Sequence, residues 1–123
     1  MARILVVDDE PDIVRVVSRI MESCGHHVMT ADDGAMAVNM VRTDRPDAVI
    51  LDLMLPTMDG HQVCHALKSD EATRQIPIIM LTAAYVSVTD AKRSGHLGAD
   101  EYVVKPFLRE VLIGNLDRLL APR

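Results

Sequence analysis

The sequence predicts an α/β fold in which a parallel sheet carries helices on both faces. Its length of 123 residues and mass of 13.6 kDa fit one domain. Short apolar runs alternate with segments of helical period along the whole chain, and we count five of each. Strict alternation of this kind is typical of parallel sheets, because each crossover between parallel strands is made by a helix. A chain of this size buries about two-thirds of its unfolded surface, which is enough for a full core.

The first half of the chain contains two strand–helix pairs. Residues 4–7 are β-branched and apolar at successive positions, as in a strand covered on both faces. A helical stripe of apolar residues then runs over 13–24. Residues 26–31 form a weaker strand pattern, and a second helix is expected to open at Gly34 and to end before Pro46.

The second half predicts three further strands and three further helices. Strands are expected over 48–51, 76–81 and 102–104, and helices near 59–69 and, with few apolar anchors, over 88–97. The closing helix is expected to start at Pro106 and to carry these apolar side chains: Phe107, Val111, Leu112, Leu116, Leu119 and Leu120.

Composition excludes several classes of function. Thirteen basic and eighteen acidic residues give a net charge of −5, with no run of Lys or Arg, so neither nucleic acid nor a membrane surface is expected as a direct partner. The apolar stretches fall far short of ~20 residues and the first residues already resemble a strand, so we expect neither a membrane span nor a secretory leader. The two cysteines, Cys24 and Cys64, form no CxxC motif and are expected to be reduced thiols in a cytoplasmic protein.

Polar side chains collect at the carboxyl ends of the predicted strands. Asp8 and Asp9 follow the first strand, Asp52 ends the third, Thr82 ends the fourth and Lys105 ends the fifth. In an open parallel sheet these ends share one edge, which is where ligands bind. Each residue alone is typical of a solvated turn or a strand cap, but their gathering at one edge predicts a site.

The chemistry of that site follows from its charges. Two carboxylates about 4 Å apart repel each other by ~4 kcal/mol at an effective dielectric constant of 20, and a hard divalent cation such as Mg²⁺ relieves this repulsion. A phosphoryl group could then be neutralised by the cation, Lys105 and Thr82. Asp52 stands alone at its strand end, which makes it the natural nucleophile for an aspartyl phosphate, whereas Asp8 and Asp9 are better placed to hold the cation.

Four segments carry a resemblance to a known family. They are ILVVDDE (4–10), VILDLMLPTMDG (49–60), IIMLTA (78–83) and GADEYVVKPF (98–107). With these segments the sequence resembles the CheY-like receiver domain of two-component response regulators over residues 3–120. The resemblance implies a flavodoxin-like sandwich of (βα)5 units with strand order 2-1-3-4-5, and a single receiver domain over 1–123. It also implies a signalling domain, not an enzyme acting on other substrates, with a histidine kinase or phosphotransfer protein as phosphoryl donor.

The resemblance also implies a role for each site residue. Asp52 would be phosphorylated, and Mg²⁺ or Mn²⁺ would be held by Asp9 directly, by Asp8 through water, by Asp52 and by the backbone carbonyl of Met54. Lys105 would contact the phosphoryl group and would precede a cis peptide bond to Pro106.

The same resemblance implies how a signal leaves the domain. Thr82 and Tyr102 would form a switch pair in which the hydroxyl moves to a phosphoryl oxygen and the ring turns inward. The surface made by helix 4, strand 5 and helix 5 would then bind an unknown downstream protein or a second copy of the chain. The segment from Thr82 to Asp90 is about one residue longer than is usual, and helix 4 is weakly apolar, so mobility is expected over 84–97.

Three other functions compete with a phosphoaccepting switch. A metal-dependent phosphohydrolase would need a general acid two residues after the nucleophile, where this chain has Met54. A mononucleotide carrier would need a phosphate loop after the first strand, where this chain has carboxylates. A receiver that signals without phosphorylation would not need the full acidic, Thr, Tyr and Lys set.

A transition-metal site at His61, Cys64 and His65, which lie at helical spacing, lacks an evident fourth ligand.

Overall fold

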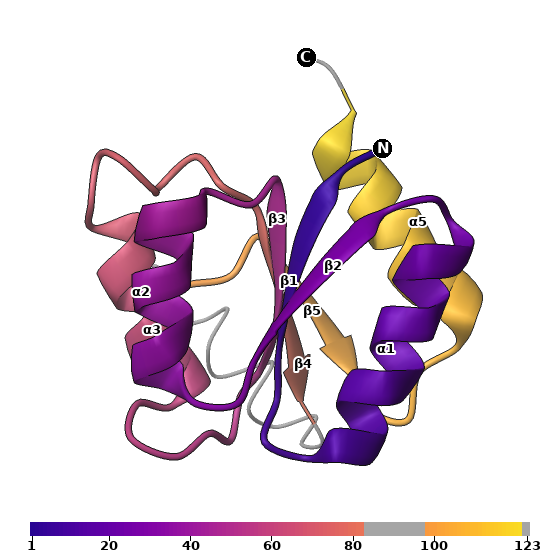
Figure 1. Ribbon diagram of the computed structural model, residues 1–123, viewed down its shortest axis with the longest axis horizontal. Coiled ribbons are helices and arrows are strands. Elements are labelled where there is room, and N and C mark those ends of the chain that lie inside the picture. The colour runs from indigo at the N-terminus through magenta and orange to yellow at the C-terminus, as the bar shows by residue number, and fades with distance from the viewer. Residues whose placement is uncertain (83–97, 122–123) are drawn as a thin grey trace.

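The computed structural model describes residues 1–82 and 98–121, and these form a sheet with helices on both faces (Figure 1). The sheet has five parallel strands in the order β2-β1-β3-β4-β5, which confirms the predicted fold class and strand order. The strands are β1 (Arg3–Val7), β2 (His27–Ala31), β3 (Ala48–Asp52), β4 (Ile78–Thr82) and β5 (Glu101–Val104).

Four helices pack against the sheet within the described residues: α1 (Pro11–Ser23), α2 (Gly34–Asp44), α3 (Gly60–Lys68) and α5 (Arg109–Leu120). In Figure 1, α1 and α5 cover one face of the sheet, and α2 and α3 cover the other. The helix expected over 88–97 and the mobility expected over 84–97 lie outside the described residues. None of the described helices is long and apolar enough to span a bilayer.

The core consists of two apolar layers, one on each face of the sheet. Ile4 and Val6 of β1 pack in the layer under α1 and α5, whereas Leu5 and Val7 pack in the layer under α2 and α3. All four are at most 1% exposed. Successive strand residues point to opposite faces, so a strand buried on both sides requires the unbroken apolar run seen in the sequence.

The start of the last helix differs from the prediction. α5 begins at Arg109, not at Pro106, because the backbone N–H of Lys105 still donates to the Thr82 carbonyl at 2.7 Å, so the chain follows the sheet to that point. Val111, one of the apolar residues of the predicted helix, is 46% exposed. It lies one residue, and hence about 100°, away from Leu112 on the helix, and Leu112 and Leu116 form the buried stripe.

The fourth strand also starts later than expected. β4 begins at Ile78, and Pro77 precedes it, because proline has no N–H to donate to a neighbouring strand. Its carbonyl still accepts from the Val49 N–H at 3.0 Å, so the segment before β4 remains attached to β3. β4 also ends one residue later than predicted, at Thr82 instead of Leu81, and so places Thr82 at the edge of the sheet, beside the end of β3.

Candidate functional site

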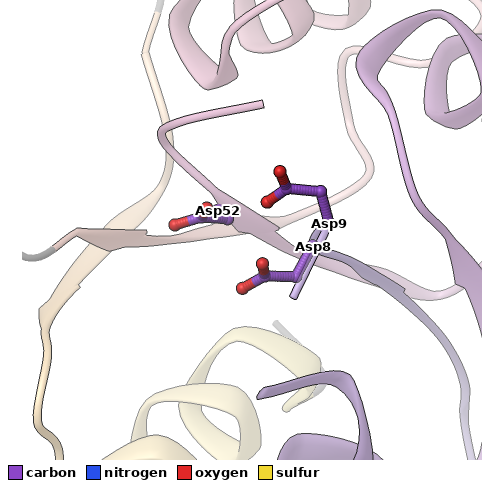
Figure 2. A group of neighbouring side chains, drawn as sticks. All are labelled: Asp8, Asp9 and Asp52. Carbon is purple, nitrogen blue, oxygen red and sulfur yellow. The ribbon is translucent and has the colours of Figure 1, made fainter. Parts of the chain in front are cut away.

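The three aspartates predicted to meet at the carboxyl edge of the sheet do so. Strands β1 and β3 are neighbours, with Val7 opposite Leu51, so Asp8 and Asp52 lie next to each other immediately beyond that pair. One carboxylate oxygen from each of Asp8, Asp9 and Asp52 lies within 4.8 Å of the others. Figure 2 shows the three carboxylates gathered at the strand ends.

Lys105 reaches this cluster from the end of β5. Its Nζ donates to Oδ1 of Asp52 at 2.9 Å and to Oδ2 of Asp8 at 3.3 Å. The Asp8 and Asp52 side chains are only 1% and 7% exposed, and that of Lys105 is 16% exposed. Short, largely buried charge pairs of this kind are stronger than surface ion pairs, because less water screens them. The Lys105–Pro106 peptide bond is cis, as the resemblance implies.

The charges in the cluster perturb one another. Burial raises the pKa of Asp52, and the negative charges of Asp8 and Asp9 raise it further, against the opposing effect of the hydrogen bond and charge of Lys105. Burial lowers the pKa of Lys105, but the hydrogen bonds and charges of Asp52 and Asp8 outweigh burial, so this pKa is raised. Lys105 therefore stays protonated and neutralises only part of the negative charge.

Backbone hydrogen bonds fix Asp8 while Asp9 faces solvent. The Asp8 N–H donates to the carbonyl of Ala31 at the end of β2, at 3.2 Å, and Oδ1 of Asp8 accepts from the Glu10 N–H at 2.9 Å. Asp9 is exposed, so the cluster has one open side. Ala31 is not among the predicted site residues, although the strand order implied by the resemblance places β2 beside β1 and hence Ala31 beside Val7.

The donor set of the cluster fits Mg²⁺. All the side-chain donors are carboxylate oxygens, the ligands that hard divalent cations prefer, and they lie close enough together to share one ion. The open side leaves room for waters or for the oxygens of a substrate, which Mg²⁺ usually keeps among its ligands.

The remaining predicted site residues lie near the cluster in different ways. Thr82 ends β4, is 1% exposed, and directly follows Leu81, the residue opposite Asp52. Tyr102 lies opposite Met80 and is partly buried against the layer under α2 and α3, so Thr82 and Tyr102 share a face of the sheet. Burial raises the pKa of Tyr102, against the opposing effect of a backbone hydrogen bond at Ala99.

Comparison with known proteins identifies the class of this fold and site. Residues 4–117 match the family described as "Response regulator receiver domain". The chain therefore belongs to the receiver-domain family of two-component response regulators.

One similar relative is the "DNA-binding dual master transcriptional regulator RpaA" of Synechocystis. It is 41% identical over 120 residues, which are 98% of this chain and 49% of that protein. The chain spans about half the length of the curated relatives it matches. The expectation that nucleic acid is not a direct partner finds no support here, since this relative is named for DNA binding.

Two solved structures illustrate the structural likeness. The receiver domain of sensor histidine kinase PA1611 from Pseudomonas aeruginosa, with a magnesium ion coordinated in its active-site cleft, has a TM-score of 0.86 and 33% identity, covering 97% of each chain. The chemotaxis response regulator CheY4 of Vibrio cholerae has a TM-score of 0.87 and 33% identity, covering 98% of this chain and 99% of that chain. These similarities confirm the CheY-like, flavodoxin-like fold.

Proposed function

We propose that this receiver is a phosphoacceptor switch in which Asp52 takes a phosphoryl group from a histidine kinase or phosphotransfer protein in a Mg²⁺-dependent reaction. The observation that carries the proposal is the contact of one lysine with two buried aspartates, at 2.9 Å to Asp52 and 3.3 Å to Asp8. A third carboxylate, Asp9, lies beside them on the open side. We also propose that residues 1–123 form a single receiver domain.

In the transfer step a carboxylate oxygen of Asp52 forms a bond to phosphorus. The phosphorus–nitrogen bond of a donor phosphohistidine breaks, its electron pair stays on the imidazole nitrogen, and that nitrogen takes a proton from solvent. Asp8, Asp9, Asp52 and the backbone carbonyl of Met54 would hold Mg²⁺. When bound, the ion would supply positive charge next to the phosphoryl oxygens. Nζ of Lys105 already donates a hydrogen bond to the Asp52 carboxylate. It can donate to a phosphoryl oxygen instead as negative charge develops on that oxygen.

The three competing functions fit the described site less well. Met54 stands two residues after Asp52, where a phosphohydrolase of this type would need an acid, and its side chain is 75% exposed. A bound mononucleotide phosphate would meet three carboxylates and one ammonium at the edge of the sheet. A receiver that signals without phosphorylation would not need three carboxylates and one ammonium gathered at the same edge of the sheet.

For the signal output we propose the switch pair Thr82 and Tyr102. Thr82 lies at the edge that carries Asp52, and Tyr102 lies on the same face of the sheet, two residues before the partner of Thr82 in β5. A hydroxyl drawn toward a phosphoryl oxygen would free space toward the Tyr102 ring and change the surface around β5 and α5.

That surface, with helix 4, is where we propose that an unidentified downstream protein or a second copy of the chain binds. Three exposed apolar side chains belong to this part of the chain: Val104 of β5, Leu108 at the N-cap of α5 and Val111 of α5. The free thiols of Cys24 and Cys64 fit the reducing cytoplasm in which we place the protein.

The test is intact-mass spectrometry after treatment with acetyl phosphate, with and without Mg²⁺. We expect a phosphoryl adduct on the wild type only when Mg²⁺ is present, and none on Asp52→Asn. Asp44→Asn, which removes an exposed carboxylate at the far end of α2, is the matched control and should behave as the wild type. An adduct on Asp52→Asn, or one formed equally in EDTA, would contradict the proposed acceptor site.

A further inference from the structure

The loop between β3 and α3, residues 53–59, is attached to the first turn of α2. The Gly34 N–H donates to the Pro56 carbonyl, and the Ala35 N–H donates to the Thr57 hydroxyl oxygen, both at 3.3 Å. These two N–H groups belong to the start of a helix, where the backbone has no partner within the helix itself. The loop supplies the missing acceptors, so the position of the loop and the position of α2 depend on each other.

The contact is too close for a side chain at position 34. A Cβ on Gly34 would collide with the carbonyl oxygen of Met58 and would lie 2.6 Å from its Cβ. Glycine therefore allows the backbone of α2 to lie directly against the backbone of the loop. The arrangement admits little sliding of one segment past the other.

Thr57 has a backbone conformation that is unfavourable for its residue type. Its φ of +66° lies in the left-handed region, which β-branched residues rarely adopt. The Met58 N–H donates to the Pro56 carbonyl at 2.8 Å and closes a tight turn around Thr57. Conformations of this kind persist only where surrounding contacts enforce them, and they concentrate at functional sites. The contacts around Thr57 include the hydrogen bond from the Ala35 N–H to its hydroxyl and the one from the Gly34 N–H to the Pro56 carbonyl.

The other end of the loop is fixed beside the acidic cluster. The Leu53 N–H donates to the Leu81 carbonyl at 3.0 Å, and the Gly60 N–H donates to the Leu53 carbonyl at 2.7 Å. The Leu53 side chain is 8% exposed, and Leu55 packs against the core. Met54 thus lies between two anchored residues, with its own side chain 75% exposed to solvent. The contacts of Leu53 and Leu55 hold the backbone of Met54 in place, whereas its side chain extends into solvent.

We propose that Thr57 is a positioning residue for the cation. Through its hydroxyl it fixes the loop against α2, and it thereby sets the carbonyl of Met54 for binding Mg²⁺ beside Asp52. The inference rests on the proposed function, because that function assigns the Met54 carbonyl to the metal. Thr57 itself would touch neither the cation nor the phosphoryl group.

The test measures Mg²⁺ affinity by isothermal titration calorimetry for two complementary variants. Thr57→Val keeps the β-branched shape and removes the hydroxyl, whereas Thr57→Ser keeps the hydroxyl and removes the methyl group. We expect Thr57→Val to bind Mg²⁺ about fivefold more weakly, which is the effect of losing one neutral hydrogen bond, and Thr57→Ser to bind like the wild type. Unfolding of the same proteins in urea and EDTA separates a loss of stability from a loss of affinity.

Equal Mg²⁺ affinity of Thr57→Val and wild type, whatever their stability in EDTA, would overturn the inference. Should Thr57→Val fail to fold, amide hydrogen exchange of the wild type takes its place. Slower exchange at Ala35 with Mg²⁺ than in EDTA would support the inference, because it links the Thr57 contact to the cation, and exchange at Ala35 unchanged by Mg²⁺ would overturn it. Asp9→Ala separates the two proposals: Mg²⁺ binding by wild type but not by Asp9→Ala supports the metal site independently of Thr57. Absence of Mg²⁺ binding by wild type would overturn both.

Discussion

Two lysines, one at each edge of the sheet, anchor clusters of opposite character. At the amino edge, Nζ of Lys68 donates to the carbonyls of Arg74 and Ile76 and to Oδ2 of Asp100, at 3.0, 2.9 and 2.7 Å. The same oxygen of Asp100 accepts from the Ile78 N–H at 2.8 Å. All three donors of the ammonium are satisfied, and one positive charge faces one negative charge.

The carboxyl edge shows the opposite balance. There Lys105 faces two buried carboxylates and a third nearby, so one positive charge meets three negative charges. Only this cluster would gain from an added cation. The difference teaches that burial of a lysine by itself does not indicate a functional site, whereas an uncompensated excess of charge around it does. Variants of the two lysines should therefore respond differently to Mg²⁺.

The largest expected effect is on stability at the amino edge. Lys68→Met removes three hydrogen bonds that tie α3 to the segment before β4 and to Asp100, so we expect the free energy of unfolding to fall by about 3 kcal/mol. Urea unfolding followed by circular dichroism measures it, since the chain has no Trp. Mg²⁺ should stabilise this variant as much as the wild type. A loss under about 1 kcal/mol would show that the cluster is only marginally stabilising.

Lys105→Met should lower stability less and change the response to Mg²⁺. In EDTA we expect the free energy of unfolding to fall by about 2 kcal/mol, because Asp8 and Asp52 lose the ammonium group that they share. Mg²⁺ should then stabilise the variant more than it stabilises the wild type, since the ion replaces the missing charge. Lys68→Met is the matched control. An equal Mg²⁺ response in both lysine variants would remove the distinction between the two edges.

Asp52→Asn should stabilise the metal-free protein by about 1 kcal/mol at pH 7. The neutral amide costs less to bury than a carboxylate and is not repelled by Asp8 and Asp9, and together these gains exceed the loss of attraction to Lys105. Folding raises the pKa of Asp52 above 3.8, so in the wild type the resulting stabilisation is complete below that pH and disappears as the pH rises through the folded-state pKa. The advantage of the variant should thus be absent at low pH and appear on going to pH 7. Thermal melts in EDTA at several pH values test this, and a lower melting temperature for Asp52→Asn at pH 7 would contradict it.

The smallest effect is on thiol chemistry, and it reports on the Lys68 cluster. Cys64 is buried on α3, one turn before Lys68, and burial raises its pKa to about 12, whereas Cys24 is exposed. At pH 8 about one Cys64 thiol in ten thousand would be ionised. A disulfide reagent should therefore modify Cys24 rapidly and Cys64 slowly in the folded wild type. Cys64 should react faster in Lys68→Met than in the wild type. Rapid reaction of both wild-type thiols would show that the amino edge opens readily.

Some features were predictable because they depend on local pattern. Unbroken apolar runs such as 48–51 require strands buried on both faces, and alternation with helices requires a parallel sheet. Parallel strands end at one edge, so Asp8, Asp52 and Lys105 had to meet once the strands were placed. The assignment of roles to Met54, Thr82 and Tyr102 came from family resemblance.

Other features depend on partners that the local pattern does not reveal. Asp8 and Asp9 are adjacent in sequence, yet only Asp8 is buried, with its N–H bonded to the Ala31 carbonyl of β2 and its carboxylate bonded to Lys105, whereas Asp9 is open to solvent. The left-handed turn at Thr57 is accompanied by a hydrogen bond from the Ala35 N–H of α2, 22 residues earlier, to the Thr57 hydroxyl.

The sequence by itself therefore determined the class of fold, the strand order through resemblance, and the edge at which the site lies. Tertiary structure decided which carboxylates Lys105 contacts, how Lys68 is compensated by a carboxylate 32 residues away, and which face of α5 is buried. The physical reason is the range of the interactions. Hydrophobic periodicity acts between residues a few positions apart, whereas hydrogen bonds between buried charges depend on contacts that form only when distant segments pack together.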